Sequence, residues 1–196
     1  MIRHRPTPLL GIRQRLINMA ILRDKYRLED LRGAHGINAG LFIPFVIRRL
    51  RADPQQTDAV LSVSLRNIGG KQKRQRTLQV RSAASLADQP MGVPEHTVTE
   101  WAALGVACIL VALYPGLKIQ AVTGQGDRFD YWVSNGRKDY GLEVTGTLAG
   151  DLESRHAAKV QQWRENPYGV DGYVVSVGFR AAIAICSFHR FHESRA

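Results

Sequence analysis

Two strand-like segments that each carry one carboxylate, with a lysine-bearing helix after them, constrain this chain more than any other feature. The first segment, residues 129–133, reads FDYWV, and the second, residues 140–145, reads YGLEVT. Successive side chains of a strand point to opposite faces, and an Asn-Gly turn at 135–136 predicts that the two segments pair as a hairpin. Asp130 and Glu143 are therefore expected to project from the same face of one sheet.

Two neighbouring carboxylates favour a metal site, because like charges repel and raise each other's pKa unless a cation lies between them. Mg²⁺ and Mn²⁺ take oxygen ligands, often one or two carboxylates together with water and a substrate phosphate. Such an ion activates water and neutralises the charge that develops during phosphodiester hydrolysis. Lys159, in a helix expected over residues 152–166, would orient that water and add positive charge.

Plainer roles for the same residues stay open. Asp130 and Glu143 are also compatible with ordinary cross-strand ion pairs to Lys138 or Arg128. Lys159 is also compatible with a solvated position on the surface of its helix.

The elements around these segments predict an α/β or α+β core over residues 95–196, with helices packed on a mixed sheet. An apolar run at 101–114 indicates a buried helix, and Thr97 followed by Glu100 has the spacing of a capping box that would start this helix at residue 97. The remaining expected elements are strands at 117–122, 129–133, 140–145, 173–179 and 182–188, with the helix at 152–166.

The first half of the chain carries all of the excess positive charge. Residues 1–90 hold 17 Lys and Arg against 6 Asp and Glu, whereas residues 91–196 hold 10 against 11. This imbalance favours a nucleic-acid surface, and a basic face for an acidic protein partner is the alternative. Residues 1–90 are expected to form a separate basic part, for which a winged-helix-like arrangement is one option, joined to the core by a linker over residues 82–94.

Helices are expected over residues 9–32 and near Pro44, followed by a β-hairpin built from 58–66 and 77–81. Four basic residues are expected at the hairpin tip, where they would contact phosphates unless the tip is an ordinary solvated loop. They are Lys71, Lys73, Arg74 and Arg76.

Composition favours a soluble protein of the cytoplasm. Hydrophobic residues make up 44% and charged residues 22% of the chain, as in a globular domain. The apolar run at 101–114 is too short to cross a bilayer, so no membrane association is expected. Cys108 and Cys186 are isolated in apolar segments, which predicts two buried free thiols in a reducing compartment.

The segment that carries Asp130 and Glu143 resembles the PD-(D/E)XK nuclease superfamily, whose fold is called restriction-endonuclease-like. The family core is a helix, a three-strand meander, a second helix and a further strand. The resemblance implies that Asp130 is the aspartate of the second strand and that Glu143 is the acid of the third. Val144 would offer its backbone carbonyl to Mg²⁺ or Mn²⁺, and Glu100 would be the assisting acid of the first helix.

One position departs from the family pattern, because Thr145 stands where the family has its lysine. Some members take this lysine from the following helix, and Lys159 is then the candidate. The resemblance implies a metal-dependent endonuclease that hydrolyses DNA in preference to RNA, as a homodimer or as a subunit of a larger complex. The alternative is a catalytically degenerate subunit that binds nucleic acid or assembles a DNA-processing complex.

Overall fold

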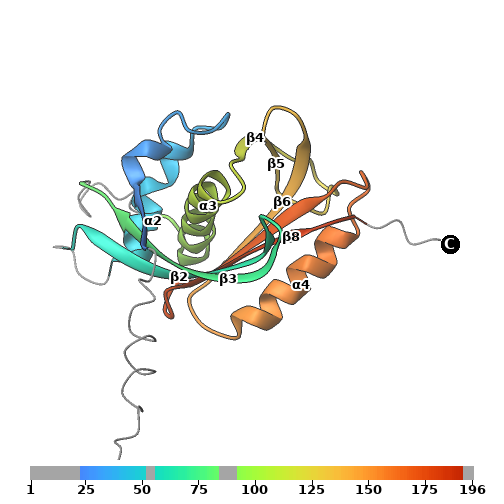
Figure 1. The fold of residues 1–196 in the computed structure, drawn as a ribbon. Coiled ribbons are helices and arrows are strands. Elements are labelled where there is room, and N and C mark those ends of the chain that lie inside the picture. The colour runs from blue at the N-terminus through green and yellow to red at the C-terminus, as the bar shows by residue number, and fades with distance from the viewer. Residues whose placement is uncertain (1–22, 52–55, 84–91, 192–196) are drawn as a thin grey trace, which may run out of the picture.

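The computed structural model describes residues 23–51, 56–83 and 92–191, which build an α+β fold around one mixed sheet of eight strands (Figure 1). The strand order is β1-β3-β2-β8-β7-β6-β5-β4. The strands are β1 Arg23–Arg27, β2 Asp58–Ile68, β3 Lys71–Arg81, β4 Lys118–Val122, β5 Tyr131–Ser134, β6 Asp139–Thr147, β7 Gly172–Gly178 and β8 Ile183–His189.

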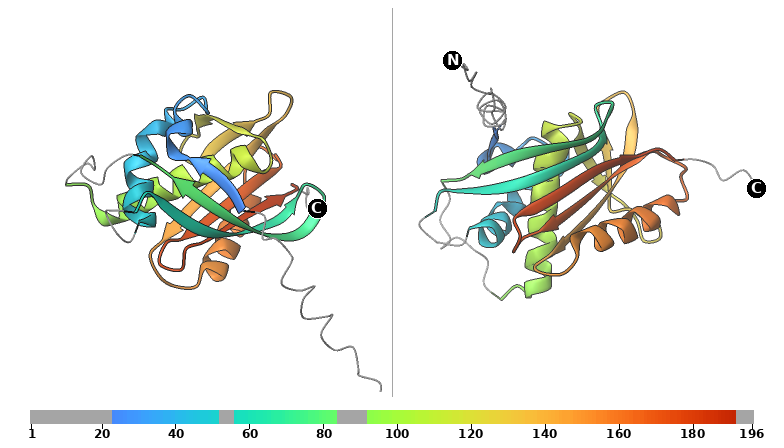
Figure 2. Two further views of the ribbon diagram at one scale, coloured as in Figure 1. Left: turned by 60° about the vertical axis from the view of Figure 1, so that its left-hand side comes forward. Right: turned by 60° about the horizontal axis from the view of Figure 1, so that its bottom comes forward.

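Helices cover both faces of the sheet. Helices α2 (Ile43–Leu50) and α3 (Glu95–Leu113) pack together on one face, and α4 (Leu152–Arg164) crosses the other beneath β6 and β7 (Figures 1 and 2). Two short 3₁₀ helices, Leu28–Leu31 and Ala39–Phe42, join β1 to α2. The mixed sheet with flanking helices confirms the coarser prediction of an α+β class.

Helix α3 is the centre of the main core because it is apolar around almost its whole circumference. By length and composition alone it would pass for a membrane span, but most of it is buried inside the fold. It approaches β6 closely at Gly146, where an added Cβ would lie 2.8 Å from both the Ala103 Cβ and the Thr99 carbonyl oxygen. This close packing fixes β6, the strand that carries Glu143, against the core.

The basic first half and the second half share the sheet and the core. Strand β2 pairs in parallel with β8, with Ser62 opposite Ile183 and Arg66 opposite Ser187. One cluster of buried apolar side chains contains residues from both halves, such as Leu61 and Val106. Within the described residues, the expected boundary between 1–90 and 95–196 therefore separates neither two sheets nor two cores.

Two local predictions are wrong. Of the helix expected over 9–32, residues 23–27 form the strand β1, which pairs in parallel with β3, residues 28–31 form a 3₁₀ helix, and residues 9–22 lie outside the described residues. The capping box at Thr97 does not form, because α3 already begins at Glu95 after Pro94. Glu95 instead forms ion pairs with Arg48 and Arg49 of α2.

Candidate functional site

Asp130 lies directly before β5 and is fixed there by the backbone of β6. Its own N–H donates to the Leu142 carbonyl at 2.9 Å. The Val144 N–H donates to Asp130 Oδ2 at 2.8 Å, so the carboxylate takes the place of the next backbone acceptor in the ladder. The other oxygen, Oδ1, accepts no hydrogen bond from the described part of the chain.

Glu143 projects from β6 beneath α4 and is completely buried, with 0% of its surface exposed. Its Oε1 accepts a hydrogen bond from Lys159 Nζ at 2.5 Å. Its Oε2 is buried and has no hydrogen-bond partner. A buried carboxylate oxygen without a donor is costly, so this atom is the most conspicuous unsatisfied group of the site.

Lys159 reaches Glu143 because α4 is anchored over this face of the sheet. The N-cap of this helix is Asp151, whose side chain accepts from the Glu153 N–H at 2.9 Å. Its buried face carries His156, Val160 and Trp163, which turns Lys159 toward β6. A second hydrogen bond, of 3.1 Å, joins Lys159 Nζ to Gln162 Oε1, one turn further on.

The surroundings disfavour negative charge on both acids. Burial, and after it the charge of Asp130, raise the pKa of Glu143 to about 7, against the hydrogen bond and the charge of the Lys159 ammonium, which lower it. Burial also raises the pKa of Asp130, against the hydrogen bond from Val144 and the charge of Lys159. Burial therefore disfavours the ionised form of both acids, and the ammonium of Lys159 offsets this only in part.

The other expected ligands differ in how closely they approach. The N–H and C=O of a strand residue point to the same side, so the Val144 carbonyl is directed, like its N–H, toward the side where Asp130 lies. Glu100 is exposed on α3, and its charge contributes to the raised pKa of Asp130. No hydrogen bond or ion pair ties Glu100 to the site within the described residues.

The plainer pairings that the sequence left open are absent from the described residues. Lys138 Nζ lies 2.7 Å from Asp171 Oδ2, and Arg128 lies 3.8 Å from Glu165. Neither Asp130 nor Glu143 is an exposed member of a cross-strand pair, and Lys159 is not a freely solvated lysine.

An open cavity of about 480 Å³ lies beside Lys159. It is bounded by the loop at 149–151 and by one flank of α4, including Ser154, Arg155, Lys159 and Gln162. Neither Asp130 nor Glu143 lines this cavity, and Lys159, which does, lies between it and the buried Glu143.

The four basic residues expected at the hairpin tip lie along β3 instead, and on both of its faces. The turn is only Gly69-Gly70, with φ of +63° and +71°, a conformation that favours glycine. Because side chains alternate, Lys71 and Lys73 share the face that α4 covers, and both are exposed. Arg74 and Arg76 are half-buried on the face of Leu78 and Val80.

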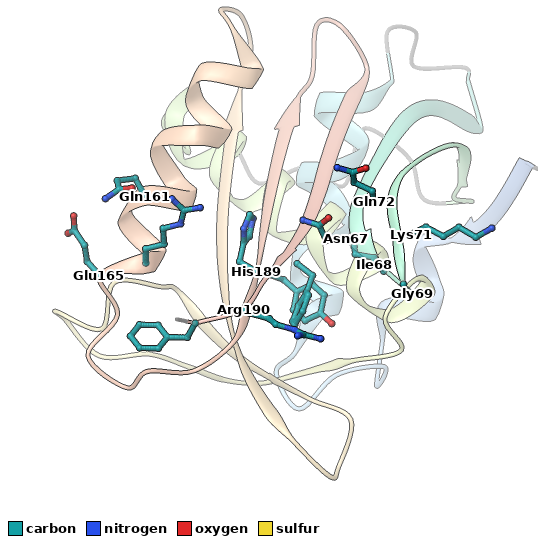
Figure 3. A pocket seen from close by; sticks show the side chains of 14 residues that line it. Asn67, Ile68, Gly69, Lys71, Gln72, Gln161, Glu165, His189 and Arg190 are labelled. Carbon is teal, nitrogen blue, oxygen red and sulfur yellow. The ribbon is translucent and has the colours of Figure 1, made fainter. Parts of the chain in front are cut away.

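Sequence reasoning missed a second cavity, of about 1120 Å³, between the hairpin and the C-terminal half of α4 (Figure 3). Its lining includes Arg164 and Arg190, together with Lys71. No periodic signal joins these positions, because they come from α4, from the end of β8 and from β3.

Within the described residues, no group of three or more His, Cys, Asp and Glu side chains lies close enough to hold a metal ion. A cation bound here would use the two carboxylates of Asp130 and Glu143, with backbone and water oxygens completing its shell. Comparisons with protein-family models, curated proteins and solved structures found no match to this chain.

Proposed function

We propose that this protein is a metal-dependent endonuclease that hydrolyses phosphodiester bonds of DNA. The observation that carries the proposal is the buried Oε2 of Glu143, which has no hydrogen-bond partner. The charge of Asp130 also raises the pKa of this carboxyl. A divalent cation would satisfy this oxygen together with the free oxygen of Asp130. The oxygen-only donor set fits Mg²⁺ or Mn²⁺.

The order of elements supports a restriction-endonuclease-like core. Helix α3, the meander of β4, β5 and β6, helix α4 and strand β7 follow one another as in that family. Asp130 stands at the start of the second of these strands and Glu143 on the third. The position of Lys159 supports the interpretation in which the helix supplies the lysine that Thr145 does not.

The residues of the site would have separate roles in metal binding and in catalysis. Asp130, Glu143 and the Val144 carbonyl would hold the ion, and Glu100 would assist through bound water. The ion, when bound, would activate water and offset the charge of the transition state. Lys159 would keep Glu143 ionised and direct its ammonium toward the phosphate, with Gln162 restricting its position.

The direct test is cleavage of plasmid and linear DNA with Mg²⁺, Mn²⁺ or EDTA. We expect metal-dependent cleavage that Asp130→Asn abolishes and Lys159→Met lowers by at least about 100-fold. Asp139→Asn is the matched control, because Asp139 is an exposed acid at the start of β6 and should leave cleavage unchanged. Cleavage that persists in EDTA or in Asp130→Asn would contradict the proposal.

A second candidate is a non-catalytic subunit that binds nucleic acid or assembles a larger complex. The observation that favours it is the 2.5 Å ion pair of Lys159 and Glu143, which balances the buried charge without a metal. This candidate predicts DNA binding that weakens steeply with salt, no cleavage with any divalent ion, and a melting temperature that does not respond to Mg²⁺.

A further inference from the structure

The cavity between the hairpin and α4 lies on the opposite flank of α4 from the acidic site. Figure 3 shows Asn67, Lys71 and Gln72 on the hairpin side, Gln161 and Glu165 on the helix side, and His189 and Arg190 between them. Gln161 and Arg164 line this cavity, whereas Lys159 and Gln162 face the acidic site. Helix α4 therefore contributes residues to both sites.

The cavity is positively charged. Lys71, Arg164 and Arg190 are exposed, and none of them pairs with a carboxylate in the described part of the chain. Glu165 is the single acidic residue of the lining, and Arg128 lies 3.8 Å from it. The same positive charge acts on His189, because burial, and after it the charges of Arg164 and Arg66, lower the pKa of this histidine to about 4.

Aromatic rings lie among these cations. Tyr173 and Phe188 pack with ring centroids 5.1 Å apart, and Phe191 lines the same cavity. Phe188 and Phe191 are half-buried, so part of each ring stays open to solvent. Unpaired cations discriminate poorly between polyanions, but cations interleaved with accessible rings are typical of sites for single strands, where unpaired bases stack on the rings.

We propose that this cavity binds a single-stranded segment of nucleic acid. Phosphates would contact Lys71, Arg164 and Arg190, and a base would stack on Phe191. His189, uncharged at neutral pH, would offer a hydrogen bond to a base or sugar. This inference rests on the proposed function for the presence of a nucleic-acid substrate, and it specifies that part of that substrate is unpaired.

The test is fluorescence anisotropy in EDTA with a labelled single strand of about 12 nucleotides, a length within known site sizes. A duplex of the same length and an RNA of the same sequence form the other arms. One variant combines Lys71→Gln, Arg164→Gln and Arg190→Gln. Its matched control combines Lys25→Gln, Lys118→Gln and Arg137→Gln, which removes the same charge from exposed positions elsewhere.

We expect the single strand to bind more tightly than the duplex, and tighter binding of the RNA would support the site with RNA as its ligand. The cavity variant should reduce the slope of log K against log salt by about 2, since each phosphate contact contributes about 0.7. Equal losses in the control variant, or a preference for duplex, would overturn the proposal.

The aromatic contribution is tested separately. Phe191 also packs on a small apolar cluster with Trp163 and Val174, so Phe191→Leu is chosen to keep the apolar volume, and Phe191→Tyr to keep the ring. Leu should weaken binding by about five- to 150-fold at every salt concentration without changing the slope, and Tyr should restore it. Equal binding by Leu and Tyr variants would overturn the stacking role.

Failure of the two proposals is distinguishable because the binding assay contains no metal. If the protein binds the single strand but shows no cleavage that depends on Asp130, the nuclease proposal is refuted and the cavity proposal stands. If the cavity variant cleaves duplex DNA as well as the wild type does, and the protein does not bind the single strand, only the cavity proposal is refuted.

Discussion

Glu143 should make the metal-free protein less stable as the pH rises from about 4.5 to about 7. Its carboxyl is fully buried with one oxygen unpaired, and its pKa is raised from 4.5 to about 7. Across that range the folded protein holds the proton more tightly than the unfolded chain does. The stabilisation is therefore complete below pH 4.5 and is lost as the pH rises through about 7.

The size of this effect follows from the same two values. Each pH unit between the unfolded and folded pKa corresponds to about 1.4 kcal/mol. A pKa that moves from 4.5 to about 7 therefore removes up to about 3 kcal/mol from the free energy of unfolding. That is a large share of the stability of a typical domain, so chemical denaturation measures it easily.

The raw pH profile would conceal this loss, because one buried and one half-buried histidine act with the opposite sign. His156 and His189 have pKa values lowered by burial to about 4, from an ordinary 6.5. Their contribution is present above pH 6.5 and is lost as the pH falls through 4. The informative quantity is the difference between the wild type and Glu143→Gln, which keeps the shape of the side chain but does not titrate.

The assay is urea unfolding in EDTA at intervals from pH 4.5 to 8. The stability of the wild type relative to Glu143→Gln should fall by about 3 kcal/mol across this range. Glu165→Gln, at an exposed acid, should give a difference that is flat within about 0.5 kcal/mol. Mg²⁺ should reverse the fall, because it binds the ionised carboxylate. If the stability of the wild type relative to Glu143→Gln stays flat or rises with pH, the argument that Glu143 is buried with an unpaired oxygen is refuted.

Three further outcomes follow from the same geometry. In thermal unfolding at pH 8, Mg²⁺ should raise the melting temperature of the wild type but not that of Asp130→Asn; an equal rise in both would place the ion elsewhere. In urea unfolding, Lys159→Met should cost little at pH 5 and progressively more toward pH 8, because Glu143 then ionises without its ammonium partner; a cost independent of pH would contradict the pair. Gly172→Ala should destabilise by about 1–3 kcal/mol, since the added Cβ would lie 2.5 Å from the Gly141 carbonyl oxygen, and a neutral change by urea unfolding would contradict that packing.

Local periodicity predicted the parts of this fold that depend on neighbours in sequence. Alternation placed Asp130 and Glu143 on one face correctly, and the Asn-Gly turn at 135–136 joins β5 to β6 as expected. The hairpin of β2 and β3 and the short helix at Pro44 were likewise predictable, because each depends on a local pattern. Boundaries shifted by one to three residues at most of these elements.

Contacts between distant segments were not predictable in the same way. The pairing of β2 with β8 joins Ser62 to Ile183, and nothing in either segment encodes the other, so the sequence suggested two parts where one sheet exists. Strand β1 reads RDKYR, a charged edge strand without the apolar alternation that indicates burial. The complete burial of Glu143 depends on where α4 crosses the sheet, which periodicity along α4 alone does not specify.

Helix α4 connects the two proposed sites. The packing of its buried face fixes the orientation of the helix, and so fixes the positions of the side chains on both of its exposed flanks. His156 is hydrogen-bonded at 2.8 Å to Ser176 of β7 and to Ser187 of β8, and Trp163 is completely buried. Because side chains of both sites lie on this one helix, a rotation that moved one flank toward its site would move the other flank away from its own. The spacing between the acidic pair and a single strand bound in the cavity would therefore be set by a rigid element rather than by a loop, as the proposed hydrolysis would require.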